Sequence, residues 1–354
     1  MGAGAAVDES VTHLISETLE GELTRIRGLP VRVTNVHRDA SCRSSTFRTE
    51  RLRVSTCGDE RPLLMYLKDL SPSQQVDRSR RPLSGEAPPD DTEIRMYEAV
   101  LSPERFGTPR YYGSRWEPAV GRCWLFIEDA GDRMLQGEHD FGSWLDTCRW
   151  LAAFHAATSH LPAGRTAFLP VFDEARYRRC AVNVERMLAA LDAGGRALVR
   201  RALDHLQDRT AWLAALPRCV IHGQLFGQNV MLRAPGAAGP VSVIDWETAA
   251  LGPGVFDLAS ITSNKRRPED RLAMRRAYLE QYQERTGRSV AWDRFEEEFT
   301  AVAVFHALEW LAWWSRRAEG SRRFAKHLRE VDTLVGGSAR APVTEGARPR
   351  GAPR

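Results

Sequence analysis

The spacing of hydrophobic and polar positions changes along this chain of 354 residues. In the first third, apolar residues recur at helical spacing over residues 8–27 and again over 93–101, with short runs of strand-forming residues between and after them. The predicted strands cover residues 31–37, 46–56, 62–70 and 123–127. This order predicts a small, β-rich region that carries two helices.

From residue 141 onward the pattern is mainly helical. The predicted helices cover residues 144–158, 173–193, 197–216, 267–286, 291–318 and 320–334. Two short apolar runs, 219–221 and 241–244, interrupt this pattern and predict strands between the helices. Both runs end in polar residues, which are therefore the first candidates for functional side chains.

We expect the chain to form two lobes. A compact apolar strand ends in an acidic turn, so the predicted N-terminal lobe covers residues 1–127 and the C-terminal lobe covers 128–335. Residues 71–92 are polar and rich in proline, which favours a flexible loop. The tail 336–354 is dominated by Gly, Ala, Pro and Arg and is predicted to be disordered. The elements together predict an α+β fold.

Composition narrows the classes of protein and partner. A hydrophobic share of 43% and a charged share of 27% are ordinary for a globular chain. The net charge is only +4 and no basic stretch is interleaved with aromatics, so we expect no nucleic-acid partner. No signal-peptide pattern and no long apolar run is present, so we expect a cytoplasmic protein that does not span a membrane. Six scattered cysteines lack metal-ligand spacing and indicate reduced thiols.

Two short strands are each followed by a side chain suited to bind a metal ion. Asn229 comes seven residues after His222, and Asp245 ends the second strand just before Trp246 and Glu247. The Mg²⁺ that accompanies nucleotide phosphates prefers oxygen ligands such as carboxylates and amide carbonyls. Either residue alone would be an ordinary turn residue. The two together predict a magnesium site.

Lys68 is one of only three lysines among 50 basic residues, and it ends an apolar strand. From that position an ammonium group can hold phosphates when a glutamate of the following helix pins it. Glu93 is the first candidate for this glutamate and Glu98 is the second. Taken alone, the residues fit equally well a lysine at a strand edge and a glutamate that favours a helix start.

Together these segments resemble the aminoglycoside phosphotransferase and choline kinase-like family, a branch of the protein-kinase-like fold. The matching segments are residues 67–68, 93–97, 125–129, 150–155, 222–229, 244–247 and 252–259. The resemblance implies two lobes, a small β-rich N-lobe and a larger, mainly helical C-lobe. It also implies ATP- and Mg²⁺-dependent transfer of the γ-phosphoryl group to a hydroxyl of a small molecule, such as an antibiotic or a sugar-like metabolite.

The resemblance further implies a role for each matched position. Lys68 would contact phosphates and Glu93 would orient it, while Asn229 and Asp245 would bind Mg²⁺. His222 would brace the candidate catalytic loop, as would Asp257. The backbone near the end of the strand at 123–127 would meet the adenine. The residues implied there are Phe126, Ile127, Glu128 and Ala130.

The loop expected to cover the phosphates spans residues 39–46 and contains no glycine, although members of the family often have at least one there. Ser44 and Ser45 are its candidate phosphate contacts. His155 and His306 lie on predicted helices and are expected to be core residues rather than catalysts.

Gln224 stands where the family carries an Asp that accepts the proton of the substrate hydroxyl. An amide cannot act as that base, and general-base help is worth about 10²–10⁴-fold. Phosphoryl transfer depends mainly on positioning and on charge stabilisation, however. We therefore expect Gln224 to orient the hydroxyl while Glu247 or a substrate group takes the proton, so that activity is reduced or rerouted.

Two other functions stay open. The chain would be a nucleotide-binding pseudokinase with a protein partner if Gln224 abolishes transfer. It would instead phosphorylate Ser or Thr of a precursor peptide in ribosomal peptide natural-product biosynthesis if residues 71–92 and the tryptophans near residue 310 border a peptide groove. Three tryptophans at helical spacing are, however, more typical of a helix core.

Overall fold

The computed structural model describes residues 9–40, 46–75, 89–233, 239–263, 267–316 and 321–336. The chain divides into two compact units. The first unit comprises residues 1–81, 87–171 and 217–290, and the second comprises 82–86, 172–216 and 291–354. Both predicted lobes contribute residues to the first unit, and the predicted lobe boundary after residue 127 stays a prediction.

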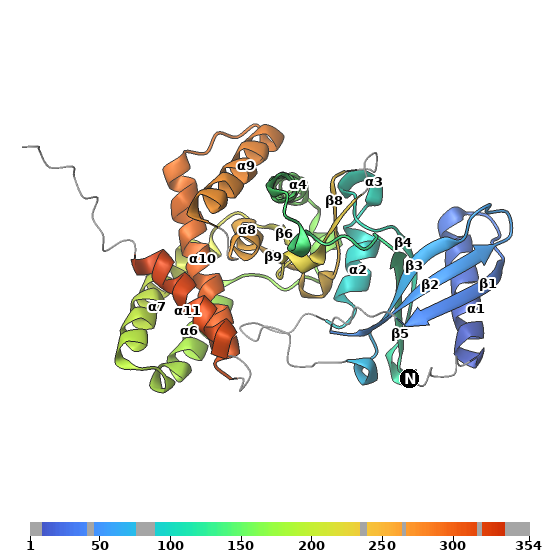
Figure 1. The fold of residues 1–354 in the computed structure, drawn as a ribbon, viewed down its shortest axis with the longest axis horizontal. Helices are drawn as coiled ribbons and strands as arrows, with labels where there is room; N and C mark the ends of the chain where they lie inside the picture. Colours follow the sequence, from blue (N-terminus) through green and yellow to red (C-terminus); the bar gives the residue numbers. More distant parts are fainter. Residues whose placement is uncertain are drawn as a thin grey trace, which may run out of the picture. The chain divides into compact units, whose positions relative to one another are not determined.

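The N-terminal part of the first unit is an antiparallel five-stranded sheet with the order β1-β2-β3-β5-β4 (Figure 1). Its strands are β1 (Val33–Ala40), β2 (Arg48–Thr56), β3 (Leu63–Asp69), β4 (Tyr111–Glu117) and β5 (Arg122–Glu128). Lys68 lies on the central strand β3, opposite Thr49 of β2 and Leu125 of β5. The sheet therefore holds this lysine between two paired neighbours.

Two helices pack with this sheet. Helix α1 (Glu9–Arg27) buries Ile15, Leu19 and Leu23, which recur every four residues and so share one face of the helix. They form one apolar core with side chains of β2, β3 and β5. Helix α2 (Thr92–Ala99) buries Glu93 together with apolar neighbours. A buried glutamate requires a partner, and this one lies in the candidate site.

The remainder of the first unit consists of helices and two short strand pairs. β6 (Cys219–Ile221) pairs with β9 (Ala250–Gly252), and β7 (Val230–Leu232) pairs with β8 (Val241–Val243), both antiparallel. The helices are α3 (Pro103–Phe106), α4 (Phe141–Thr158), α5 (Ala163–Thr166), α8 (Val255–Thr262) and α9 (Pro268–Thr286). The turns between the short strands carry the candidate functional residues.

The second unit is helical. It contains α6 (Glu174–Met187), α7 (Ala193–Ala214), α10 (Trp292–Trp314) and α11 (Ser321–Gly336). Trp310 and Trp313 are buried in α10, as is His306, which agrees with their interpretation as core residues. His155, in the first unit, is buried too.

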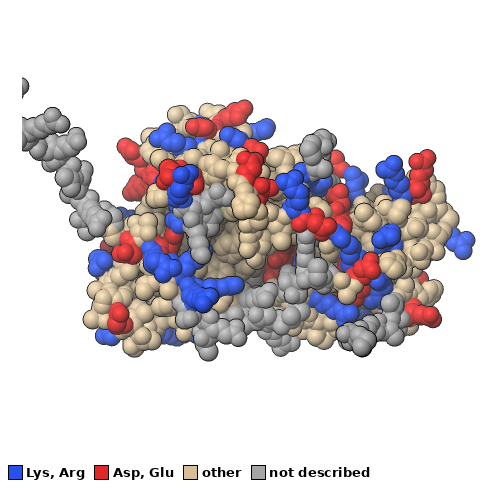
Figure 2. All heavy atoms as spheres, in the orientation of Figure 1, with Lys and Arg blue, Asp and Glu red and all other residues tan. Residues whose placement is uncertain are grey.

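Several predictions concern segments at the limits of the described residues. In the predicted loop 71–92, Pro72–Gln74 forms one short 3₁₀ turn, whereas residues 76–88 lie outside the described part of the chain. Gly336 is the last residue of α11, and the rest of the predicted tail also lies outside the described part of the chain. Among the described helices, none is both long and apolar enough to cross a membrane. On the face drawn in Figure 2, basic and acidic side chains are interspersed.

Candidate functional site

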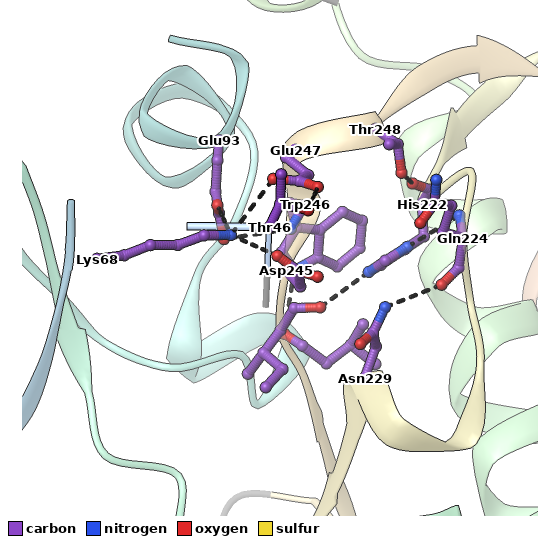
Figure 3. Close-up of polar contacts among 12 residues, drawn as sticks. Thr46, Lys68, Glu93, His222, Gln224, Asn229, Asp245, Trp246, Glu247 and Thr248 are labelled. Carbon is purple, nitrogen blue, oxygen red and sulfur yellow. Dashed lines mark hydrogen bonds and ion pairs between the residues drawn. The ribbon is translucent and has the colours of Figure 1, made fainter. Parts of the chain in front are cut away.

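Lys68 and three carboxylates form a buried ionic cluster in the first unit (Figure 3). The Lys68 Nζ atom lies 2.5 Å from Glu93 Oε2 and forms a second ion pair with Asp245. It also lies 3.8 Å from Glu247 Oε2. The side chains of Lys68 and Glu93 are only 6% and 1% exposed. Glu98, the second candidate partner, instead accepts a hydrogen bond from a tyrosine hydroxyl. Glu93 is therefore the glutamate that holds the lysine.

The cluster has more negative than positive charge. Burial opposes the charge of Lys68, but Asp245, Glu93 and Glu247 outweigh it and raise the pKa of the ammonium well above its usual value. Burial raises the pKa of the Glu93 carboxyl to about 7, and Lys68 offsets part of this rise. One ammonium facing three carboxylates leaves an excess of negative charge, which favours a bound cation.

Asp245 has an unusual backbone conformation. Its φ of 69° makes it the single non-glycine residue with positive φ among the residues described. The left-handed conformation costs most side-chain-bearing residues about 1–2 kcal/mol and costs Asp less, because its short polar side chain can form local hydrogen bonds; such conformations often occur at functional sites. The following residue anchors the turn, because Trp246 N donates to Glu93 Oε1 at 3.3 Å and Trp246 Nε1 donates to Val243 O at 3.0 Å.

The segment after β6 is held by a buried carboxylate of α8. Asp257, which is fully buried, accepts hydrogen bonds from His222 N at 2.6 Å and from Gly223 N at 2.9 Å. Gly223 has a φ of 83°, and a Cβ at this position would overlap the carbonyl oxygen of Thr248. Only glycine therefore allows this turn without strain.

The His222 side chain connects the two polar segments. Its Nε2 donates to Ile244 O at 2.9 Å, and its Nδ1 accepts from Gln224 N at 3.2 Å. Burial lowers the pKa of His222, so the ring is neutral and has one donor and one acceptor, as these bonds require. The ring also packs against Trp246, with centroids 4.8 Å apart. His222 thus fixes Gln224 relative to the strand end that carries Asp245.

Asn229 and Gln224 are joined through main-chain and side-chain contacts. Asn229 Nδ2 donates to Gln224 O at 3.0 Å, and Ile244 N donates to Asn229 O at 3.0 Å. The side-chain amide of Asn229 uses its nitrogen in this contact, which leaves its side-chain oxygen Oδ1 to face other ligands. Gln224 Nε2 is buried and, within the described residues, has no hydrogen-bond partner.

The residues present fit a magnesium nucleotide better than a metal held by protein alone. Among the described residues, no three His, Cys, Asp or Glu side chains are grouped so as to hold a metal. Mg²⁺ usually keeps several waters and binds one or two carboxylates together with substrate phosphates. The Asp245 carboxylate, 19% exposed, and the amide oxygen of Asn229 supply that smaller set of hard donors.

Other predicted contacts lie at the end of β5 and in the loop after β1. Phe126 and Ile127 are buried, and Glu128 is joined to Arg233 at 3.3 Å. Ala130 follows the end of β5 and is partly exposed.

Ser44 and Ser45 lie outside the described residues. At the end of the same loop, Thr46 Oγ1 donates to Glu247 Oε1 at 2.6 Å. The sequence did not point to this contact, because the two residues are 201 positions apart.

The chain belongs to a phosphotransferase enzyme family, whose model matches residues 103–297. Similar solved structures include an aminoglycoside 2″-phosphotransferase-IIIa complex with GDP and kanamycin, with a TM-score of 0.56 and 16% identity over 92% of this chain and 99% of that one. A choline kinase from Cryptosporidium parvum Iowa II has a TM-score of 0.57 and 13% identity over 92% and 97% of the two chains.

A thermostable mutant of aminoglycoside phosphotransferase APH(4)-Ia, in a ternary complex with ADP and hygromycin B, has a TM-score of 0.56 and 15% identity over 92% and 100%. No curated protein matches the sequence. The predicted family and the predicted kinase-like fold are confirmed. Membership of this family also agrees with our interpretation of the chain as an enzyme.

Proposed function

We propose that this protein transfers the γ-phosphoryl group of Mg²⁺·ATP to a hydroxyl of a small molecule. The observation that carries the proposal is the ionic cluster of Lys68, Glu93 and Asp245, which is joined through His222 to the loop that bears Asn229. A phosphotransferase family and neighbours solved with GDP, ADP, kanamycin and hygromycin B support it.

In the proposed mechanism, Mg²⁺ would be held by Asp245 and Asn229 and would supply charge neutralisation at the phosphate oxygens. Lys68 donates to a phosphate oxygen, and Glu93 keeps the ammonium in place at 2.5 Å. His222 maintains the distance between the two metal-binding segments through its bond to Ile244 O. These side chains contribute positioning and charge, which dominate phosphoryl transfer.

Gln224 contributes orientation rather than proton transfer. Its amide has no basic site at an accessible pH, so it can only donate or accept a hydrogen bond at the acceptor. Glu247 accepts a bond from Thr46 and faces Lys68, so its carboxylate is already engaged inside the ionic cluster. A basic group on the acceptor itself is therefore the better candidate for that step.

Gln224 is also the observation that favours a second candidate, a nucleotide-binding pseudokinase with a protein partner. The two functions differ in one measurement, which is the release of ADP that depends on an added acceptor. A precursor peptide as acceptor gains no support from the described residues, since 76–88 are not among them.

The experiment combines calorimetry with a panel of hydroxyl acceptors. We expect Mg²⁺-dependent ATP binding that weakens at least tenfold in Asp245→Asn and Asn229→Ala, and acceptor-dependent ADP release that both variants lose. Gln224→Asp should raise the rate, by up to about 10²–10⁴-fold, if a missing base limits transfer. Tight Mg²⁺·ATP binding without transfer in either the parent protein or Gln224→Asp would support the pseudokinase. Absence of Mg²⁺·ATP binding would refute both functions.

A further inference from the structure

A pocket of about 360 Å³ opens on the surface of the first unit between α3, α4 and α9. None of the candidate site residues lines it. Its lining consists of Arg105, Phe106, Trp150, Ala153, Phe154, Ala156, Ala157 and Arg285. The volume is at the lower end of the range of small-molecule sites, roughly 300–1,000 Å³.

The wall of the pocket follows from the sequence of α4. Trp150, Ala153, Phe154 and Ala157 recur at intervals of three and four residues, so they share one face of the helix. The two alanines leave room beside the two aromatic rings. Those rings are stacked, with centroids 5.3 Å apart and planes 8° from parallel. Trp150 Nε1 donates to Phe106 O at 2.6 Å, which fixes the orientation of the indole.

Two arginines stand at the rim of this flat apolar wall. Arg105 and Arg285 are exposed, and within the described part of the chain neither forms an ion pair. The guanidinium of Arg105 lies 5.0 Å from the ring centre of Phe106. An adjoining hollow shares both arginines and also contains acidic residues, but each of these acidic residues already lies near another arginine. Asp146 pairs with Arg149 at 2.8 Å, and Glu104 lies 3.7 Å from an arginine.

We propose that this pocket is a second binding site, which takes a small aromatic carboxylate. The aromatic part would lie against the Trp150 ring, which is already held in place and costs little to order on binding. The carboxylate would meet both Arg105 and Arg285, because a planar guanidinium matches a carboxylate with parallel hydrogen bonds. An aromatic amine would be repelled by both arginines, and a neutral amide would lose the charge-assisted bonds.

The test uses isothermal titration calorimetry with indole-3-acetate as the probe, beside indole-3-acetamide and tryptamine. We expect binding of the carboxylate, at least tenfold weaker binding of the amide, and none of the amine. Arg105→Gln and Arg285→Gln should each weaken binding about tenfold, which corresponds to about 1.4 kcal/mol. Ala153→Phe should fill the pocket and abolish binding. The control, Arg122→Gln, removes an exposed arginine of β5 that lines neither hollow and should have no effect.

Equal binding of the carboxylate and the amide, or no binding at millimolar indole-3-acetate, would overturn the proposal. If Ala153→Phe fails to fold, the two arginine variants still decide the outcome. Binding of the probe does not require ATP, so the failure of the proposed function would leave this measurement intact.

Discussion

Replacing Asp257 with asparagine tests whether one buried carboxylate holds the candidate catalytic loop. The carboxylate accepts hydrogen bonds from His222 N at 2.6 Å and Gly223 N at 2.9 Å, and its third contact is His155 Nε2 at 3.3 Å. Asparagine has nearly the same shape but only one acceptor oxygen. Whichever way its amide turns, an NH₂ group faces a donor from the loop or from His155.

The expected loss of stability can be worked out from these contacts. A hydrogen bond to a charged group contributes about 1.5–3 kcal/mol, and a buried donor left without a partner costs a further 1–3 kcal/mol or so. Because the site is fully buried, water cannot replace the lost acceptor. We therefore expect Asp257→Asn to lower the free energy of unfolding by about 3–5 kcal/mol, a large share of a typical total of about 5–15 kcal/mol.

Urea unfolding followed by circular dichroism measures this change through the midpoint, provided that the slope is unchanged. The matched control is Asp146→Asn, which removes an exposed carboxylate that pairs with Arg149 at 2.8 Å and should cost at most about 1 kcal/mol. Affinity for Mg²⁺·ATP should fall in Asp257→Asn and stay unchanged in the control. Equal midpoints for the two variants would show that the loop does not depend on this carboxylate.

Three further features are each tested by substitution. Asp245→Ala should be about 1 kcal/mol less stable than Asp245→Asn in urea, because Asn tolerates the left-handed backbone better; equal stability would contradict the strain at this turn. Gly223→Ala should lose roughly 2 kcal/mol or more, because its Cβ overlaps the Thr248 carbonyl, and an unchanged urea midpoint would disprove that overlap. Burial and neighbouring cations lower the pKa of His327 to about 3, below the unfolded value near 6.5. The unfolded chain therefore takes up the proton first, and stability should fall by about 2 kcal/mol between pH 6.5 and 5. His327→Phe, which keeps a ring against Trp310, should show less of this loss in urea unfolding at both pH values, and an identical loss would refute the assignment.

The parts of the site that were predictable from the sequence are local. Asn229 and Asp245 follow short apolar runs, and their residue types alone suggest oxygen ligands. Lys68 was visible because lysine is rare in this chain, and Glu93 of the following helix was the first candidate for its partner, ahead of Glu98. In the first unit Lys68 pairs with both Glu93 and Asp245, which agrees with the expected partner of the lysine.

The parts that were not predictable depend on distant contacts or on very short elements. β4 mixes Tyr, Gly and Arg without alternation, because it is the edge strand and is only partly buried. β7 and β9 contain three residues each, too few to show a period. The contact between Thr46 and Glu247 joins residues that are 201 positions apart, so no local pattern indicates it. The left-handed conformation of Asp245 has no signal in the residue types around it.

At Gln224 the structure separates the support of the loop from the chemistry that the side chain offers to an acceptor. The loop is held by main-chain groups at this position, because Gln224 N donates to His222 and Gln224 O accepts from Asn229. Neither bond uses the side chain, and the Asp257 anchor does not involve residue 224 at all. A change from carboxylate to amide therefore alters the chemistry offered to an acceptor without removing a support of the loop. Gln224→Asp should accordingly fold like the parent protein, so that any change in its transfer rate reports on proton transfer and not on the integrity of the site.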